Sequence, residues 1–223
     1  MGDNRAYCSV RLNVDTMKKL GILLLCVIML VPVVASAQCP VSVVIGDNSR
    51  IRTSFGVGVC GAYTMLTPSL SNLDLKPEIG LGGHVQMALL FNRFFGIETE
   101  VSYVRGSVKA SFDGSRPKHE IETTNVDIPL FLTFRLFGIA HLNLGPQFTV
   151  MSRAEYAIDG QTYFFGPMYP TFNVAASLRL KLLGNLMLEG RYIYPLRVSN
   201  NSFMGSEFTT VAKRATLGLT LSF

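Results

Sequence analysis

Hydrophobic and polar residues alternate along the chain from about Ser54 to its end. In the first segment Phe55 and Val57 would point to one side of an extended chain, and Gly56 and Gly58 to the other. Successive side chains of a β-strand point to opposite faces, so this period of two predicts a strand. The pattern recurs in seven further segments, around residues 81–89, 95–103, 125–135, 141–150, 172–179, 186–194 and 211–223.

These segments predict an all-β, eight-stranded antiparallel up-and-down transmembrane β-barrel. Each has about ten residues, the length that a tilted strand needs to cross a bilayer. The connections are too short for parallel crossovers, and they alternate between short turns and long loops. Outer-membrane barrels have short periplasmic turns and long extracellular loops, so we expect both chain ends in the periplasm. The long connections are expected at residues 65–76, 105–120, 153–168 and 197–208.

The two faces of these strands distinguish a membrane barrel from a soluble one such as a lipocalin. The face opposite the apolar side chains is rich in small residues. Such a face would be a poor solvent-exposed surface, but it suits a crowded barrel interior. Mixed charges are tolerated in a narrow lumen only where they pair. We expect a structural polar network there, made of His84, Gln86, Glu98, Glu100, Asp127, Arg135, Arg179, Glu189, Arg191 and Arg214.

Two details of this network can be predicted. A three-residue turn at residues 183–185 would place Arg179 opposite Glu189 on neighbouring strands, as an ion pair inside the barrel. Glu98 and Glu100 resemble a catalytic carboxylate pair, but we expect them to be held in the lumen by Arg135 and Gln86. Because an eight-stranded barrel is filled by its own side chains, a general diffusion porin is disfavoured.

The beginning of the chain reads as a cleavable secretory signal. An apolar block at residues 20–34 follows Lys18 and Lys19 and precedes Ala35-Ser36-Ala37. At about fifteen residues it is short for a membrane-spanning helix, which needs about 20, although an N-terminal anchor helix is the alternative. We expect residues 1–16 to be an upstream extension or mis-start, 17–37 a signal peptide, 38–53 a periplasmic segment and 54–223 the barrel.

The cysteines and histidines indicate no metal site. Cys8 and Cys26 would leave with the leader, whereas Cys39 and Cys60 would reach an oxidising compartment. A disulfide between Cys39 and Cys60 is left open, because neither spacing nor context proves it. Lipidation of Cys39 is not expected, because Gln38 precedes it. Two cysteines and three scattered histidines lack ligand spacing, so we expect neither a metal nor a cofactor.

An enzymatic interpretation requires a catalytic group at the membrane edge. Some small outer-membrane barrels act on lipid A through a His and a Ser oriented by an acid. Here His84 and His141 face inward and His119 falls in a long connection, and none has a Ser and an acid at matched depth. Geometry precedes any assignment of a general base, so no catalytic residue is expected.

Only part of the net charge of +5 can indicate an anionic partner, because the leader contributes to this charge. In the barrel domain, cationic side chains gather in the second long connection: Arg105, Lys109, Arg116, Lys118 and His119. Nucleic acid is not expected as a partner of an exported barrel. The phosphates of lipopolysaccharide would attract these side chains, and a solvated loop is the alternative.

The last strand and the central hairpin resemble known barrel proteins. The chain ends LGLTLSF, with Phe223 last, Leu221 and Leu219 alternating before it, and Gly218. This resembles the signal that the outer-membrane barrel assembly machinery reads. VDIPLFLTFRL followed by HLNLGPQFTV is similar to the central hairpin of the small outer membrane protein beta-barrel domain family common in Bacteroidota, related in architecture to OmpX-like and opacity barrels and to the porin family. The resemblance implies a bacterial outer-membrane location and eight strands, and no single activity.

We therefore expect a structural or interaction barrel in the outer membrane. Its extracellular loops would contact lipopolysaccharide or protein partners that the sequence does not identify. A component of an envelope secretion or assembly complex and a lipid A-modifying membrane enzyme are the alternatives.

Overall fold

The structure is a computed structural model that describes residues 42–44, 50–112 and 119–223. The expected upstream extension, the signal peptide and Cys39 lie outside the described residues. Within the described ranges, no helix has the length and apolarity needed to span a membrane.

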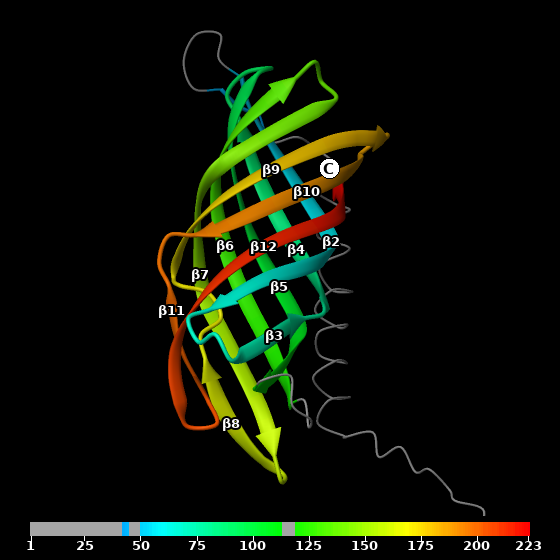
Figure 1. Cartoon of the computed structure of the whole chain (residues 1–223). Helices are drawn as coiled ribbons and strands as arrows, with labels where there is room; N and C mark the ends of the chain where they lie inside the picture. Colours follow the sequence, from blue (N-terminus) through cyan, green and yellow to red (C-terminus); the bar gives the residue numbers. More distant parts are fainter. Residues whose placement is uncertain (1–41, 45–49, 113–118) are drawn as a thin grey trace, which may run out of the picture. The chain divides into compact units, whose positions relative to one another are not determined.

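Eight antiparallel strands of the described chain close into a ring (Figure 1). Each strand pairs with the next, and the last pairs with the first along a register that runs from Ser222↔Gly56 to Thr210↔Pro68. The predicted all-β, eight-stranded antiparallel barrel is therefore confirmed. In ring order the strands are β2 (Arg50–Pro68), β4 (Ile79–Leu90), β5 (Phe95–Phe112), β6 (His119–Leu136), β7 (Ala140–Ile158), β9 (Phe172–Leu183), β10 (Leu186–Pro195) and β12 (Ser206–Ser222).

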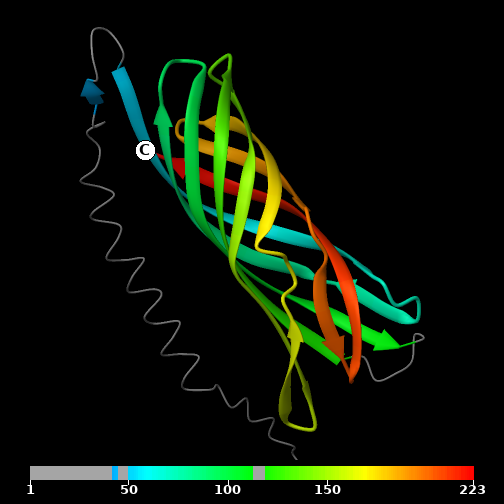
Figure 2. The same ribbon diagram turned by 90° about the vertical axis from the view of Figure 1, so that its left-hand side faces the viewer.

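The long connections differ from the predicted loops, because much of each is paired β-structure. β3 (Leu73–Pro77) pairs with β5, β8 (Gln161–Gly166) with β7, and β11 (Ser199–Phe203) with β12. β5, β6 and β7 also run beyond the predicted segments, and β5 and β6 stay paired as far as Ala110↔His119 (Figure 2). We call these paired strands beyond the predicted membrane segments the outer extension. At the other end, β1 (Ser42–Val44) pairs with β2.

The alternation places apolar side chains on the outside of the membrane segments and polar ones inside. Val59, Leu81 and Val101 are more than half exposed on the outer face, whereas Glu98 and Asp127 are buried. An outer apolar surface with a polar interior is the arrangement of a barrel in a bilayer.

The turn between β9 and β10 has two residues, Gly184 and Asn185, rather than the three that were predicted. Gly184 has a φ of 55°, a left-handed conformation that glycine adopts without strain. A bulge between Leu186 and Met187 supplies the additional residue, so Arg179 still lies opposite Glu189.

Candidate functional site

Three carboxylates and two guanidinium groups meet in the middle of the lumen, and we call them the central cluster. Arg179 contacts Glu98 (Nη1–Oε1 2.5 Å) and Glu189 (Nε–Oε2 2.8 Å). Arg191 binds both oxygens of Glu100 and also contacts Glu189 (Nη2–Oε1 2.6 Å). β5 supplies Glu98 and Glu100, and β9 and β10 on the far side of the ring supply the others, so the pairs join opposite walls across the lumen.

His84 lies beside this cluster and could at first sight belong to a metal site. Its Nε2 is 3.1 Å from Thr220 Oγ1 and 3.9 Å from a Glu189 oxygen, and the ligand atoms of His84, Glu100 and Glu189 lie within 4.8 Å of one another. Both carboxylates, however, already accept hydrogen bonds from Arg191. A guanidinium group in this position repels a metal cation, so the geometry favours an ion-pair network.

A second polar layer lies nearer the outer extension. Arg214 forms an ion pair with Asp127, whose other oxygen accepts a hydrogen bond from Thr149 Oγ1 (2.6 Å). The Arg214 guanidinium also stacks on Tyr169, 4.7 Å from the ring centroid, and the Tyr169 hydroxyl is 2.7 Å from Thr64 Oγ1. Through these contacts the segment that contains Tyr169 is joined to four strands, β2, β6, β7 and β12, and they form a second polar layer across the lumen.

The interior of the outer extension is apolar. Phe203 is fully buried there and packs against the rings of Phe112, Tyr156 and Phe165, with centroids 5.0–6.3 Å apart. We call this group of side chains the outer core: Leu73, Leu75, Val108, Ala110, Ile121, Ala154, Tyr156, Phe165, Met168, Tyr169, Phe203, Phe208 and Ala212. Two small cavities that border these layers measure about 10 Å³ each, room for about one water molecule. The described side chains therefore fill the barrel from its middle to its outer end.

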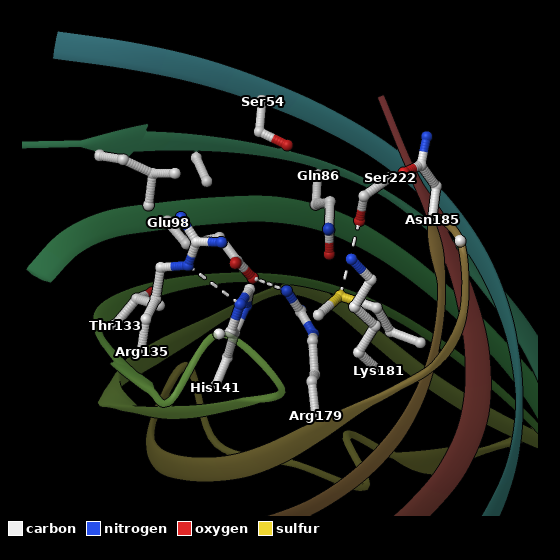
Figure 3. Close-up of a pocket in the computed structure, with 15 residues that line it drawn as sticks. Ser54, Gln86, Glu98, Thr133, Arg135, His141, Arg179, Lys181, Asn185 and Ser222 are labelled. Atoms are coloured by element: carbon white, nitrogen blue, oxygen red, sulfur yellow. Dashed lines mark hydrogen bonds and ion pairs between the residues drawn. The ribbon is translucent and has the colours of Figure 1, made fainter. Parts of the chain in front are cut away.

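The opposite end, where the short turns lie, contains a cavity of about 140 Å³ that we call the cup (Figure 3). The Arg179–Glu98 ion pair is part of its wall. Arg135 also lines it and donates a hydrogen bond from Nε to His141 Nε2 (3.1 Å). The other residues of the wall are Ser54, Gln86, Ala88, Leu90, Thr133, Gly138, Lys181, Gly184, Asn185, Met187 and Ser222.

The carboxylates therefore have other partners than the sequence suggested. Glu98 pairs with Arg179, and Glu100 chiefly with Arg191, rather than with Arg135 and Gln86. Arg135 is near the short-turn end of its strand, where His141 on the neighbouring strand is directly opposite. Strand alternation fixes which side chains enter the lumen, but it does not give their depth relative to strands across the ring.

Acidic partners hold several cations on the outside of the outer extension. Arg105 pairs with Glu122 (Nη2–Oε2 2.6 Å), and Lys109 pairs with Glu78. The hydrogen bonds from Lys109 and Ser107 lower the pKa of Glu78, and the bond to Glu78 raises the pKa of Lys109. Arg116 and Lys118 lie outside the described residues, and the His119 ring packs against Phe203, 6.0 Å between centroids.

Lys213 differs from these cations, because it lies on the outer face of β12 beside an exposed aromatic ring. Its Nζ is 5.5 Å from the centroid of the Tyr194 ring. Among the described residues it has no carboxylate partner within ion-pair distance. A mirror arrangement is found at the short-turn end, where the Arg93 guanidinium lies 5.9 Å from the Phe94 ring centroid.

The C-terminal residues that were predicted to be an assembly signal lie where the last strand pairs with the first. Phe223 exchanges two backbone hydrogen bonds with Phe55 (2.7 and 3.2 Å), while Leu219 and Leu221 face outward. A Cβ at Gly218 would lie 2.4 Å from Val59 O, so no larger residue fits there. The role of these residues as an assembly signal stays a prediction.

Within the described residues Cys60 is a free thiol beside the lumen. Because Cys39 is outside them, the disulfide between these two cysteines also stays a prediction.

The cup was not predicted from the sequence. Lys181, Thr133 and His141 all line it, yet the predicted lumen network contained none of them. A signal was present, since each belongs to the polar face of its strand and lies close to a short turn. Reading the polar face together with the distance from each turn would have grouped these residues.

Comparison with known proteins identifies one matching family and several similar solved structures. The outer membrane protein beta-barrel domain family matches residues 37–201. The crystal structure of Neisserial surface protein A superposes with a TM-score of 0.51 at 16% identity, covering 76% of this chain and 97% of that one. The structure of Ail, the attachment invasion locus protein of Yersinia pestis, in complex with the heparin analogue sucrose octasulfate, has a TM-score of 0.48 at 15% identity, covering 77% of this chain and 97% of that one. OprG from Pseudomonas aeruginosa has a TM-score of 0.46 at 9% identity, covering 77% of this chain and 95% of that one. Among curated protein sequences, none matches the chain.

Proposed function

The chain belongs to the outer membrane protein beta-barrel domain family, and from this premise we propose that it is an interaction barrel rather than a general diffusion porin. It is a protein of the bacterial outer membrane. In our proposal residues 17–37 are a cleaved signal peptide, the short turns and both termini face the periplasm, and the outer extension stands outside the cell. That extension and the membrane surface beside it contact lipopolysaccharide or a protein partner.

The filled interior is the observation that carries this proposal. The outer core, the Arg214–Asp127 layer and the central cluster follow one another along the lumen. Opening a water path would require breaking buried ion pairs, at about 3–5 kcal/mol for each partner left unpaired. A barrel closed in this way offers solutes no continuous path, which favours contacts made by its outer extension and its membrane-facing surface.

The outer extension is also suited to binding, because its strands are paired. A partner that binds ordered strands loses less conformational entropy than one that must first order a free loop. Its outward side chains include the ion pairs Arg105–Glu122 and Lys109–Glu78, which leave the surface both polar and structured.

Lys213 favours lipopolysaccharide as one of the partners. Its ammonium group has no acidic partner among the described residues, and it lies over an aromatic ring on the lipid-facing side of the barrel. Aromatic rings mark the depth of the membrane interface, where the phosphates of lipopolysaccharide lie in the outer leaflet. An ammonium group at that depth attracts phosphate strongly.

We propose no catalytic role for the histidines. His84 is buried in the lumen, and its Nε2 faces both Thr220 and Glu189, so the ring does not bridge an acid and a nucleophile through its two nitrogens. His119 packs on Phe203 in the outer extension, and His141 accepts a hydrogen bond from Arg135.

Retention of lipopolysaccharide tests the proposal. The protein is extracted gently from outer membranes, and native mass spectrometry counts the lipopolysaccharide molecules that remain bound. We expect the wild type to retain lipopolysaccharide and Lys213→Gln to retain less. Arg93→Gln is the matched control, because Arg93 also lies over an aromatic ring but at the short-turn end. Absence of lipopolysaccharide from the wild type, or equal loss in both variants, would contradict this part of the proposal.

A further inference from the structure

The cup has an excess of positive charge that the ion-pair network does not neutralise. Arg179, Arg135 and Lys181 line it, and Glu98 is the one acidic residue in its described wall. Glu98 is already paired with Arg179. Among the described residues, no carboxylate lies within ion-pair distance of Arg135 or Lys181, so the cup has two cations available for a ligand.

His141 does not satisfy Arg135. Because Arg135 Nε donates to His141 Nε2, that imidazole nitrogen carries no proton and the ring is in its neutral Nδ1–H form. The contact orients the guanidinium and leaves its charge in place. A guanidinium has five N–H donors in a planar fork, so donors remain for an oxyanion.

Two buried side chains of the wall also have polar atoms without a partner in the described structure. Gln86 is 5% exposed and Thr133 1% exposed, and neither Gln86 Oε1 nor Thr133 Oγ1 has a hydrogen-bond partner. Figure 3 shows the Gln86 amide pointing into the cup. Its Nε2 is directed to the wall, where a Cβ at Gly56 would lie only 2.6 Å away. A buried polar atom left unpaired costs stability, so a ligand in the cup that formed hydrogen bonds with these two atoms would remove that cost.

We infer that the cup binds one phosphate group that keeps a proton, either inorganic phosphate or the end of a phosphomonoester. The phosphate oxygens accept hydrogen bonds from Arg135, Lys181 and the Thr133 hydroxyl. The P–OH donates to Gln86 Oε1, which a fully ionised group cannot do. The cavity of about 140 Å³ has room for roughly five water molecules, so it also accommodates the first atoms of an ester group.

Other anions, such as sulfate or a carboxylate, fit the cup less well than phosphate. Sulfate has the shape of phosphate but carries no proton near neutral pH, so it would face Gln86 Oε1 with an acceptor. A carboxylate has the same defect and fewer oxygens. Matching a buried acceptor with another acceptor leaves both unpaired, and sites built on such groups discriminate strongly. The site is independent of the proposed contact with lipopolysaccharide; only its periplasmic access rests on the proposed topology.

Calorimetric titration of the purified full-length barrel in detergent tests the site. The titrants are inorganic phosphate, glycerol 3-phosphate and sulfate, at about pH 6, where phosphomonoesters keep about half of their second proton. We expect phosphate to bind more tightly than sulfate. Binding of glycerol 3-phosphate as well would identify a phosphomonoester end as a source, and its exclusion would identify the free ion.

Variants locate the binding. Arg135→Gln and Lys181→Gln are each expected to weaken phosphate binding by about tenfold or more, the effect of losing one charge-assisted hydrogen bond. Gln86→Leu is expected to remove the preference for phosphate over sulfate. Arg93→Gln is the control, because this cation is at the same end but does not line the cup. A shift on boiling in a denaturing gel establishes that each variant is folded. Absence of phosphate binding to the wild type, equal affinity for sulfate, or equal loss in Arg93→Gln would overturn the inference.

Discussion

Arg179 on β9 and Glu189 on β10 lie directly opposite each other, with Nε and Oε2 2.8 Å apart, and both are almost fully buried. Arg179 also contacts Glu98 and Glu100 on β5, so one side chain joins walls that are not neighbours in the ring. This contact therefore helps to close the interior between β5, β9 and β10.

Removing the Arg179 guanidinium is expected to be strongly destabilising. Arg179→Ala leaves Glu98 and part of the charge of Glu189 without a partner, which should lower the free energy of unfolding by about 3–5 kcal/mol. Urea titration of the barrel in lipid vesicles measures this difference. Arg93→Ala, in an exposed turn, should change it by less than about 0.5 kcal/mol. A loss for Arg179→Ala as small as that of the control would show that the central cluster does not stabilise the barrel.

Gly145 allows β6 and β7 to approach closely. A Cβ at this position would lie 2.0 Å from Leu130 O, and that backbone atom cannot move without disturbing the strand pairing. Gly145→Ala should therefore cost about 1–3 kcal/mol or more and reduce the folded fraction, measured as the heat-modifiable band on a gel. Gly190→Ala is the matched control, because a Cβ at Gly190 meets nothing within 4 Å. Equal folding of the two variants would be inconsistent with this packing.

Phe203 should matter for the outer extension more than for the membrane ring. Phe203→Ala removes a fully buried ring from the outer core, which costs about 3–5 kcal/mol in a rigid core. We expect limited proteolysis to cut the variant near β8 and β11 while the heat-modifiable ring persists. Met204→Ala, at the neighbouring exposed position, should be as resistant as the wild type. Wild-type resistance of Phe203→Ala would show that the outer core is not needed to order the extension.

The Glu78–Lys109 pair should give the outer extension a pH dependence with a defined sign. Because the pKa of Glu78 is lowered from its ordinary value of 4.5, its contribution is present above that value and is lost as pH falls through the lowered pKa. Because the pKa of Lys109 is raised from 10.5, the contribution persists below that value and is lost as pH rises through the raised pKa. Carbon-detected NMR titration should show the Glu78 pKa moving up toward its ordinary value in Lys109→Gln. Lys76→Gln, whose partner is Asp74, should leave it unchanged, and a shift of equal size there would refute the assignment.

The sequence was sufficient for the membrane part of the fold because one rule applies to most of it. Apolar side chains such as Val59 and Leu81 face lipid and the other face is mostly polar or small, although Phe131 and Ile193 are buried in the lumen. The pairing of Arg179 with Glu189 could be predicted because neighbouring strands share a register. A compensating bulge, and not the assumed turn length, brought about the agreement.

The outer extension was missed because the rule reverses there. Val108 and Ile121 face inward while Lys109 and Glu122 face outward, as in a barrel that stands in water. A strand prediction that requires an outward apolar face ends where the pattern reverses, so these residues were predicted to be loops. Contacts across the ring, such as Arg179 with Glu98, were also out of reach, because strand tilt sets the relative depth of residues that are not on neighbouring strands.

Single-channel recording in planar lipid bilayers tests the central claim, a lumen filled by its own side chains, most directly. The wild-type barrel is folded in detergent, verified by its shift on boiling, and inserted into the bilayer. We predict no stable open conductance at any applied voltage that the bilayer withstands. A steady conductance of the wild type that rises with salt concentration would contradict the account, because it would require a continuous water path past Arg179, Arg214 and the outer core.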